Sequence, residues 1–269
     1  MAGRQCRVLF WIIVTAFAIP VARLTAKSPI PHRQAHAHND YLHPRPLLDA
    51  LDQGFCSVEA DIFLVEGELL VAHSPLEIKA DRTLRALYLD PLRERIRSNG
   101  GSVYGDGQRI TLLIDIKSKG EATFKILNAL LAEYPDVFTS VESGNVRQGP
   151  VLAIVSGDRP IKAITAEPIR FVGIDGRLAD LESTEPNHLI PLISDNWGVH
   201  FRWRGVGEMP VEEREKLSSI IEQAHAKNRL VRFWAIPDNS DMWRAMRAAG
   251  VDLINTDDLE GLNRFLGTP

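Results

Sequence analysis

The stretch Ser57-Val-Glu-Ala-Asp-Ile-Phe-Leu64 carries the signals that decide both the fold and the chemistry of this chain. Its apolar, β-rich residues predict a strand. Glu59 and Asp61 are two residues apart, so on a strand their side chains share one face. A carboxylate inside an apolar strand is costly to desolvate, and two together indicate a bound cation.

Similar apolar runs recur along the chain, and segments with helical spacing separate several of them. The predicted strands are Gln34–His38, Ser57–Leu64, Ile110–Ile116, Val151–Val155, Phe171–Ile174, Leu189–Ile193, Leu230–Ile236 and Asp252–Asn255. Apolar residues fall on one helical face within Leu127–Tyr134, Leu217–Ala224 and Met242–Met246. Pro210 marks the start of the second of these helices, and Gly250 marks the end of the third.

This alternation of strands and helices predicts a parallel sheet with helical crossovers. About eight strands in 269 residues favour an α/β fold of the (β/α)8 TIM-barrel type over an open doubly wound sheet. No Gly-x-Gly-x-x-Gly follows a predicted strand, which argues against a nucleotide cofactor. We therefore expect a single TIM-barrel domain over residues 27–269.

Residues 1–26 differ from this domain in composition. Arg4 and Arg7 precede an uncharged, mostly apolar run from Val8 to Ala22, which is shorter than the ~20 residues of a membrane span. The pattern predicts a signal peptide over residues 1–26, and hence a secreted or periplasmic protein. An uncleaved anchor that holds the protein at a membrane is the alternative.

The overall charge and the cysteines exclude several classes of protein. The formal net charge is −4, from 31 Lys and Arg against 35 Asp and Glu, so nothing favours nucleic-acid binding. No basic amphipathic face is present, so any membrane contact is expected to be peripheral. Cys6 lies in the predicted signal, and the remaining Cys56 is predicted to be a small core residue. The oligomeric state stays open.

Polar side chains also end three other apolar runs. His36 and His38 share a face, His73 ends the run that begins at Leu69, and Asp115 shares a face with Lys117. Three carboxylates without a thiolate suit a hard ion such as Mg²⁺ or Ca²⁺, and two histidines beside such an ion suit acid–base catalysis. A phosphodiester site needs this combination. The metal and the lysine neutralise phosphoryl oxygens, one histidine takes a proton from the nucleophile, and the other protonates the leaving oxygen.

The other histidines fit plainer roles. A single buried histidine is more often a hydrogen-bonded core residue than a catalyst, and we interpret His36 in this way. His43 stands beside Pro44 and is predicted to lie in a loop. The later histidines at 188, 200 and 225 have no convergent partners in the sequence.

The order His, Glu-x-Asp, His, Asp-x-Lys resembles the phosphatidylinositol-phospholipase-C-like phosphodiesterase superfamily, in its glycerophosphodiester phosphodiesterase and sphingomyelinase D branch. The matching segments are His38, Gly54–Asp61, Val71–His73, Asp115–Lys117, Val231–Trp234 and Gly250–Asp257. The resemblance covers nearly all of residues 27–269. The opening His-Asn-Asp-Tyr is most similar to a branch that includes proteins named for altered inheritance of mitochondria.

The resemblance implies a metal-dependent phosphodiesterase on a TIM barrel, with one divalent cation, Mg²⁺ or Ca²⁺. The residues that it implies are His38 and His73 as the catalytic acid–base pair, Glu59, Asp61 and Asp115 as metal ligands, and Lys117, Asn39 and Trp234 as substrate contacts. The expected substrate is a small-molecule or lipid phosphodiester of the glycerophosphodiester or lysophospholipid type. Water attacks directly, or an internal hydroxyl of the substrate attacks first and gives a cyclic phosphate.

Three departures from the family pattern leave the head group of the substrate open. Typical glycerophosphodiesterases begin the motif with His-Arg-Gly and carry a later Glu-Asn-Thr. Here Asn39 and Asp40 replace the former, and the latter is absent. The third metal ligand is Asp115, as in sphingomyelinase D-like members, where glycerophosphodiesterases usually have Glu.

Two other functions compete with this interpretation. A metal-dependent amidohydrolase also uses His-x-His on its first strand, but such a site needs further histidines on later strands, and Phe171–Ile174 and Leu189–Asp195 offer none. A non-catalytic secreted binding protein on the same fold is the second alternative, because a fold does not determine a function.

Overall fold

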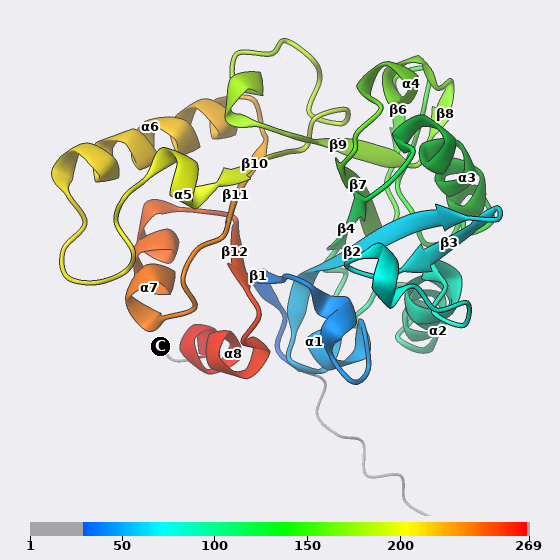
Figure 1. Ribbon diagram of the computed structural model, residues 1–269, viewed down its shortest axis with the longest axis horizontal. Helices are drawn as coiled ribbons and strands as arrows, with labels where there is room; N and C mark the ends of the chain where they lie inside the picture. The colour runs from blue at the N-terminus through cyan, green and yellow to red at the C-terminus, as the bar shows by residue number, and fades with distance from the viewer. Residues whose placement is uncertain (1–28, 268–269) are drawn as a thin grey trace, which may run out of the picture.

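The computed structural model describes residues 29–267, in which eight parallel strands close into a ring (Figure 1). Neighbours follow the order β1-β12-β11-β10-β9-β7-β4-β2, and pairing of β1 with β2 closes the ring. The predicted (β/α)8 TIM barrel is therefore confirmed. The barrel strands are β1 (His32–Ala37), β2 (Phe55–Val65), β4 (Ile110–Ile116), β7 (Val151–Gly157), β9 (Val172–Gly176), β10 (Leu192–Asn196), β11 (Leu230–Trp234) and β12 (Leu253–Thr256).

Helices lie around the outside of this ring (Figure 1). They are α1 (Leu48–Asp52), α2 (Asp90–Ser98), α3 (Gly120–Ala132), α4 (Ile161–Ala166), α5 (Trp197–His200), α6 (Val211–Ala226), α7 (Ser240–Ala249) and α8 (Leu259–Gly267). Short helical turns are η1 (Asp40–Leu42), η2 (Pro75–Glu77), η3 (Arg85–Leu89) and η4 (Leu178–Asp180). Only η4 stands between β9 and β10, where a regular barrel has a full helix.

Two small β-structures are added to the barrel. Strand β3 (Glu68–Val71) pairs antiparallel with β2 and forms a hairpin that ends just before His73. Strands β5 (Ser140–Glu142), β6 (Asn145–Arg147) and β8 (Ile169–Arg170) form a separate three-stranded sheet. Because these three strands directly precede β7 and β9 in the chain, their sheet lies toward the amino-terminal end of the barrel.

The second and third predicted helices have the expected ends. Helix α6 follows Pro210 directly, and two acidic residues lie in its first turn. Asn239 caps the start of helix α7, because its side chain accepts a hydrogen bond from the Met242 amide. Gly250 caps the end of the helix with φ of 88°, a left-handed conformation that favours glycine.

The barrel interior is apolar toward the amino-terminal ends of the strands and polar toward their carboxyl ends. A small cluster of buried side chains fills the amino-terminal half; it consists of Leu113, Ile154, Leu192 and Leu253. Two residues further along the same four strands, the inward positions are polar: Asp115, Ser156, Ser194 and Asn255. The candidate site therefore lies on an apolar floor, at the carboxyl ends of the strands, where TIM barrels carry their active sites.

The predicted signal segment 1–26, with Cys6, lies outside the described residues. Cys56 is buried, and burial raises the pKa of its thiol to about 12, so its role as a small core residue is confirmed. Over residues 29–267, no helix is both long and apolar enough to cross a membrane.

Candidate active site

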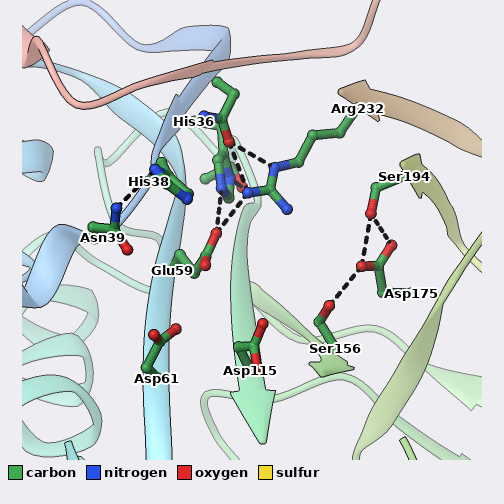
Figure 2. Close-up of polar contacts among 12 residues, drawn as sticks. His36, His38, Asn39, Glu59, Asp61, Asp115, Ser156, Asp175, Ser194 and Arg232 are labelled. Atoms are coloured by element: carbon green, nitrogen blue, oxygen red, sulfur yellow. Dashed lines mark hydrogen bonds and ion pairs between the residues drawn. The ribbon is translucent and has the colours of Figure 1, made fainter. Parts of the chain in front are cut away.

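Three carboxylates converge on two neighbouring strands (Figure 2). Glu59 and Asp61 lie on one face of β2, and strand register places Asp115 of β4 directly beside Asp61. One oxygen from each of the three lies within 4.8 Å of the others. Glu59 and Asp61 are buried, with 5% and 0% of their surfaces exposed. We call these three residues the acidic trio.

The acidic trio has the chemistry of a site for a hard cation. Oδ1 of Asp61 is buried and has no hydrogen-bond partner among the described residues, although a buried carboxylate oxygen normally has one. Burial raises the pKa of Asp61, and the charge of Glu59 adds to this effect. Burial also raises the pKa of Asp115 to about 6. A divalent cation would offset this burial and repulsion, so the trio suits a hard divalent cation.

Lys117 partly neutralises the trio in the structure. Its ammonium Nζ lies 2.9 Å from Asp61 Oδ2 and 3.3 Å from Asp115 Oδ1. The sequence interpretation places this ammonium on the substrate, whereas the structure places it on the acids that would hold a metal. A bound cation would therefore share Asp61 and Asp115 with Lys117, or displace its ammonium toward an anionic substrate.

A buried layer supports Glu59 on the side away from Asp61 (Figure 2). The Arg232 guanidinium of β11 donates to Glu59 Oε2 at 2.6 Å and to Asn255 Oδ1 at 2.7 Å. His36 Nε2 lies 3.2 Å from Glu59 Oε2, and its Nδ1 lies 2.7 Å from Ser57 Oγ. Burial alone would raise the pKa of Glu59, but Arg232 and His36 lower it below its ordinary value.

His36 has a supporting place in this layer. It is fully buried, and burial with the nearby Arg232 lowers the pKa of its imidazole to about 3. A neutral imidazole with both nitrogens occupied cannot readily exchange a proton with a substrate. His36 therefore orients Glu59.

His73 meets the trio from the end of the β2–β3 hairpin. Its Nδ1 lies 3.3 Å from Asp61 Oδ2 and 2.9 Å from the Tyr41 hydroxyl. The Tyr41 hydroxyl in turn donates to Asp61 Oδ2 at 2.6 Å, and its ring stacks beside the His73 ring at 6.3 Å between centroids. The His73 side chain is 56% exposed, so solvent reaches its imidazole ring.

His38 follows β1 and lies beside Glu59 (Figure 2). Its Nδ1 donates to Asp257 Oδ1 at 2.9 Å, and the Asn39 amide donates to the same oxygen at 3.3 Å. Burial would lower the pKa of His38, but the Asp257 hydrogen bond and the charge of Glu59 raise it overall. The structure thus brings His38, Asn39 and the trio together at one end of the barrel.

Trp234 takes no part in these contacts. It ends β11 at the same end of the barrel, opposite Asn196 in the strand register. Within residues 29–267 it forms no hydrogen bond or ring contact with the acidic trio or with either histidine. Its predicted role as a substrate contact stays a prediction.

A second polar cluster lies beyond Asp115 (Figure 2). The buried Asp175 of β9 accepts hydrogen bonds at 2.7 Å from the hydroxyls of Ser156 and Ser194. Arg177 forms an ion pair with the same carboxylate at 2.8 Å. Strand register places Ser156 beside Asp115, so this cluster continues the polar layer around the barrel.

Sequence reasoning missed Tyr41, Arg232, Asp175 and Asp257 as members of these clusters. For Arg232 a signal exists in Val231-Arg-Phe-Trp234, because a charged residue alternates there with buried apolar ones. The partners of Tyr41 and Asp257 have no such local signal, since they come from distant segments.

Family and sequence comparisons agree with the resemblance seen in the motifs. A model described as the AIM6-like phosphodiesterase domain matches residues 25–172, and one for the glycerophosphoryl diester phosphodiesterase family matches residues 231–260. Altered inheritance of mitochondria protein 6 from Eremothecium gossypii is 28% identical over 91% of this chain and 72% of its own length. A homolog of that protein from Arthroderma benhamiae is 28% identical over 88% of this chain and 84% of its own length.

Solved structures support the fold. A glycerophosphodiester phosphodiesterase from Parabacteroides distasonis aligns with a TM-score of 0.52 at 13% identity, over 89% of this chain and 96% of its own. A calcium-dependent phosphoinositol-specific phospholipase C from Pseudomonas sp. aligns with a TM-score of 0.54 at 14% identity, over 90% of this chain and 93% of its own. At such low identity these similarities concern the barrel alone.

Proposed function

Because the chain belongs to the AIM6-like phosphodiesterase family, we propose that it is a metal-dependent phosphodiesterase. The observation that carries the proposal is the acidic trio, in which buried Asp61 Oδ1 lacks a partner among the described residues and each histidine lies beside a trio carboxylate. The proposed substrate is a phosphodiester of the glycerophosphodiester or lysophospholipid type. We further propose that the protein is exported and meets membranes only peripherally.

The proposed cation is Mg²⁺ or Ca²⁺, held by the acidic trio. When bound, it would neutralise the phosphoryl oxygens and stabilise the charge that develops during the reaction. Lys117 has a related role, because its ammonium already lies at the trio and can turn to an anionic phosphoryl group. Arg232 keeps Glu59 ionised and therefore able to act as a ligand.

The two histidines divide the proton transfers between them. The Asp257 hydrogen bond occupies Nδ1 of His38 and so leaves Nε2 to act; the raised pKa favours His38 as the acid for the leaving oxygen. His73 Nδ1 is occupied by Tyr41 and Asp61, which leaves its Nε2 to accept a proton from the attacking hydroxyl or water. This assignment is compatible with direct hydrolysis and with a cyclic phosphate.

A screen of phosphodiesters tests the proposal, with and without divalent ion and with products identified by mass spectrometry. His38→Ala and His73→Ala should each lower turnover by about 10²–10⁴-fold, the usual contribution of a positioned acid or base. His43→Ala is the matched control, because within residues 29–267 the side chain of this loop histidine forms no hydrogen bond or ion pair with the trio, and the variant should keep full activity. Near-normal turnover by both variants would reject the assignment. Saturable binding of phosphodiesters without turnover would instead favour a binding protein.

A further inference from the structure

A cavity of about 300 Å³ lies at the amino-terminal end of the barrel, away from the acidic trio. Its apolar wall comes from the first residues of barrel strands, among them Leu152 of β7, Val172 of β9 and Leu230 of β11. The small sheet of β5, β6 and β8 closes another side through Val146 and Arg170. Cavities of this size accommodate small organic ligands.

Arg170 contributes a buried positive charge that has no acidic partner. The residue is only 6% exposed, and its guanidinium donates to the backbone oxygens of Val172 at 2.8 Å and His188 at 2.9 Å. Its other terminal nitrogen contacts His188 Nδ1. Burial lowers the pKa of Arg170, and no carboxylate of residues 29–267 forms an ion pair with it. Buried cations are normally paired, so this one lacks a counter-ion.

The rest of the cavity wall also favours a negatively charged ligand. Arg109 is the second cation on the wall, and no Asp or Glu lies on it. Amide side chains of Asn187 and Asn228 add neutral hydrogen-bond donors. Glu167 and Glu185 line a neighbouring cavity that Arg170 also borders, and neither forms an ion pair with Arg170.

We propose that this cavity binds a small organic anion, in which a carboxylate or phosphate head is carried on a short apolar body. The head lies against Nε and the remaining Nη2 hydrogen of Arg170, for which no acceptor is found among residues 29–267, and these two donors can bind both oxygens of such a group at once. Arg109 lies at the outer side. The apolar body packs on Leu152, Val172 and Leu230. The site is independent of the phosphodiesterase chemistry, since it lies at the other end of the barrel.

The test is a binding measurement with the full chain in the presence of a chelator. Hexanoate and hexyl phosphate serve as complete probes, because each has an anionic head and an apolar chain. Inorganic phosphate has only the anionic head, and hexanol has the apolar chain without the charge. Calorimetry should show saturable binding of the two complete probes and weaker binding of each part. In NMR spectra, the amides of Val172 and Leu230 should shift, whereas that of Ile116 near the acidic trio should not.

Variants locate the binding. Arg170→Met should weaken it by about tenfold or more, as expected for loss of a charged hydrogen bond, and Arg109→Gln by about threefold. Arg147→Gln is the matched control, because this exposed arginine lies on β6 between two cavity residues but is absent from the cavity wall. It should bind like the parent protein. Val146→Trp fills the cavity from a 44% exposed position and should abolish binding.

Three results would overturn the proposal. The first is absence of saturable binding by both complete probes. The second is parent-like affinity in Arg109→Gln and Val146→Trp, which decides the question even if Arg170→Met fails to fold. The third is loss of binding in Lys117→Gln, because this variant alters only the acidic end of the barrel and should leave the affinity for hexanoate unchanged.

Discussion

Gly157 lies against the acidic trio at the end of β7, and its replacement by alanine should damage the proposed metal site. Its φ is +69°, and a Cβ built on it would lie 2.1 Å from Asp115 Oδ1 and 2.5 Å from the Ile116 carbonyl oxygen. Real Cβ atoms essentially never approach another atom within 3.0 Å. The Asp115 carboxylate would therefore have to move by about 1 Å, out of its present position beside Asp61.

Two free-energy terms contribute to the expected effect. A non-glycine residue in the left-handed region costs about 1–2 kcal/mol of folding stability. Misplacing a catalytic group by ~1 Å can lower the rate by about 10²-fold, and disturbing the orientation of a metal ligand costs about 10–100-fold in metal affinity. A factor of about 10² corresponds to about 2.7 kcal/mol. We expect Gly157→Ala to lose about 10²-fold in affinity for Mg²⁺ or Ca²⁺ and a similar factor in turnover.

Gly144→Ala separates the two terms. Gly144 lies in the turn between β5 and β6 with φ of +81°, and a Cβ there would meet nothing within 4 Å. This variant bears the backbone cost alone, so it should lose stability in urea unfolding but bind metal like the parent protein. Calorimetric titration with each ion measures the affinities. Equal metal affinity in Gly157→Ala and Gly144→Ala would refute the placement of Asp115 in a metal site.

Three further results are expected. Arg232→Met leaves buried Glu59 without its guanidinium and should lower the unfolding free energy by about 3–5 kcal/mol in urea titrations; a loss below ~1 kcal/mol would contradict the role of this pair. Burial raises the pKa of Asp40 from 3.8 to about 7, so its ionisation opposes folding, and the destabilisation grows as pH rises through this range. Relative to Asp40→Asn, the parent protein should lose about 2–3 kcal/mol of stability between pH 5 and pH 8, and parallel pH curves would disprove this. Chelation should abolish turnover and Mg²⁺ or Ca²⁺ should restore it; a chelator-insensitive enzyme would exclude the metal.

The barrel was predictable because each strand carries its own local pattern. All eight predicted strands are present, and the differences are at their ends. The run Leu189–Ile193 shows why such ends are hard to place. Pro191 has no amide hydrogen, so β10 begins only at Leu192, while the Leu189 carbonyl accepts a hydrogen bond from Ile174. Apolarity marks the region, but hydrogen bonding sets the boundary.

The candidate site was predictable only in part. Glu59, Asp61 and Asp115 carry a local signal, because charge within a buried strand is costly wherever the strand lies. The contact between Arg232 and Glu59 joins residues 173 positions apart, and no local pattern pairs them. The position of the Lys117 ammonium was also not predictable, since only the folded geometry decides whether this flexible side chain contacts acidic groups or solvent.

The two candidate catalytic histidines are attached to different parts of the molecule. His38 continues a strand that is bonded on both sides within the closed ring, whereas His73 follows β3, which pairs with β2 and is held on its other edge only by the short segment Arg82–Thr83. His73 is thus attached to less of the barrel than His38. Fraying of the β2–β3 hairpin would widen the gap between the His38 and His73 imidazoles, while every barrel strand would keep its neighbours. The site would then admit substrates of different width without unfolding of the barrel.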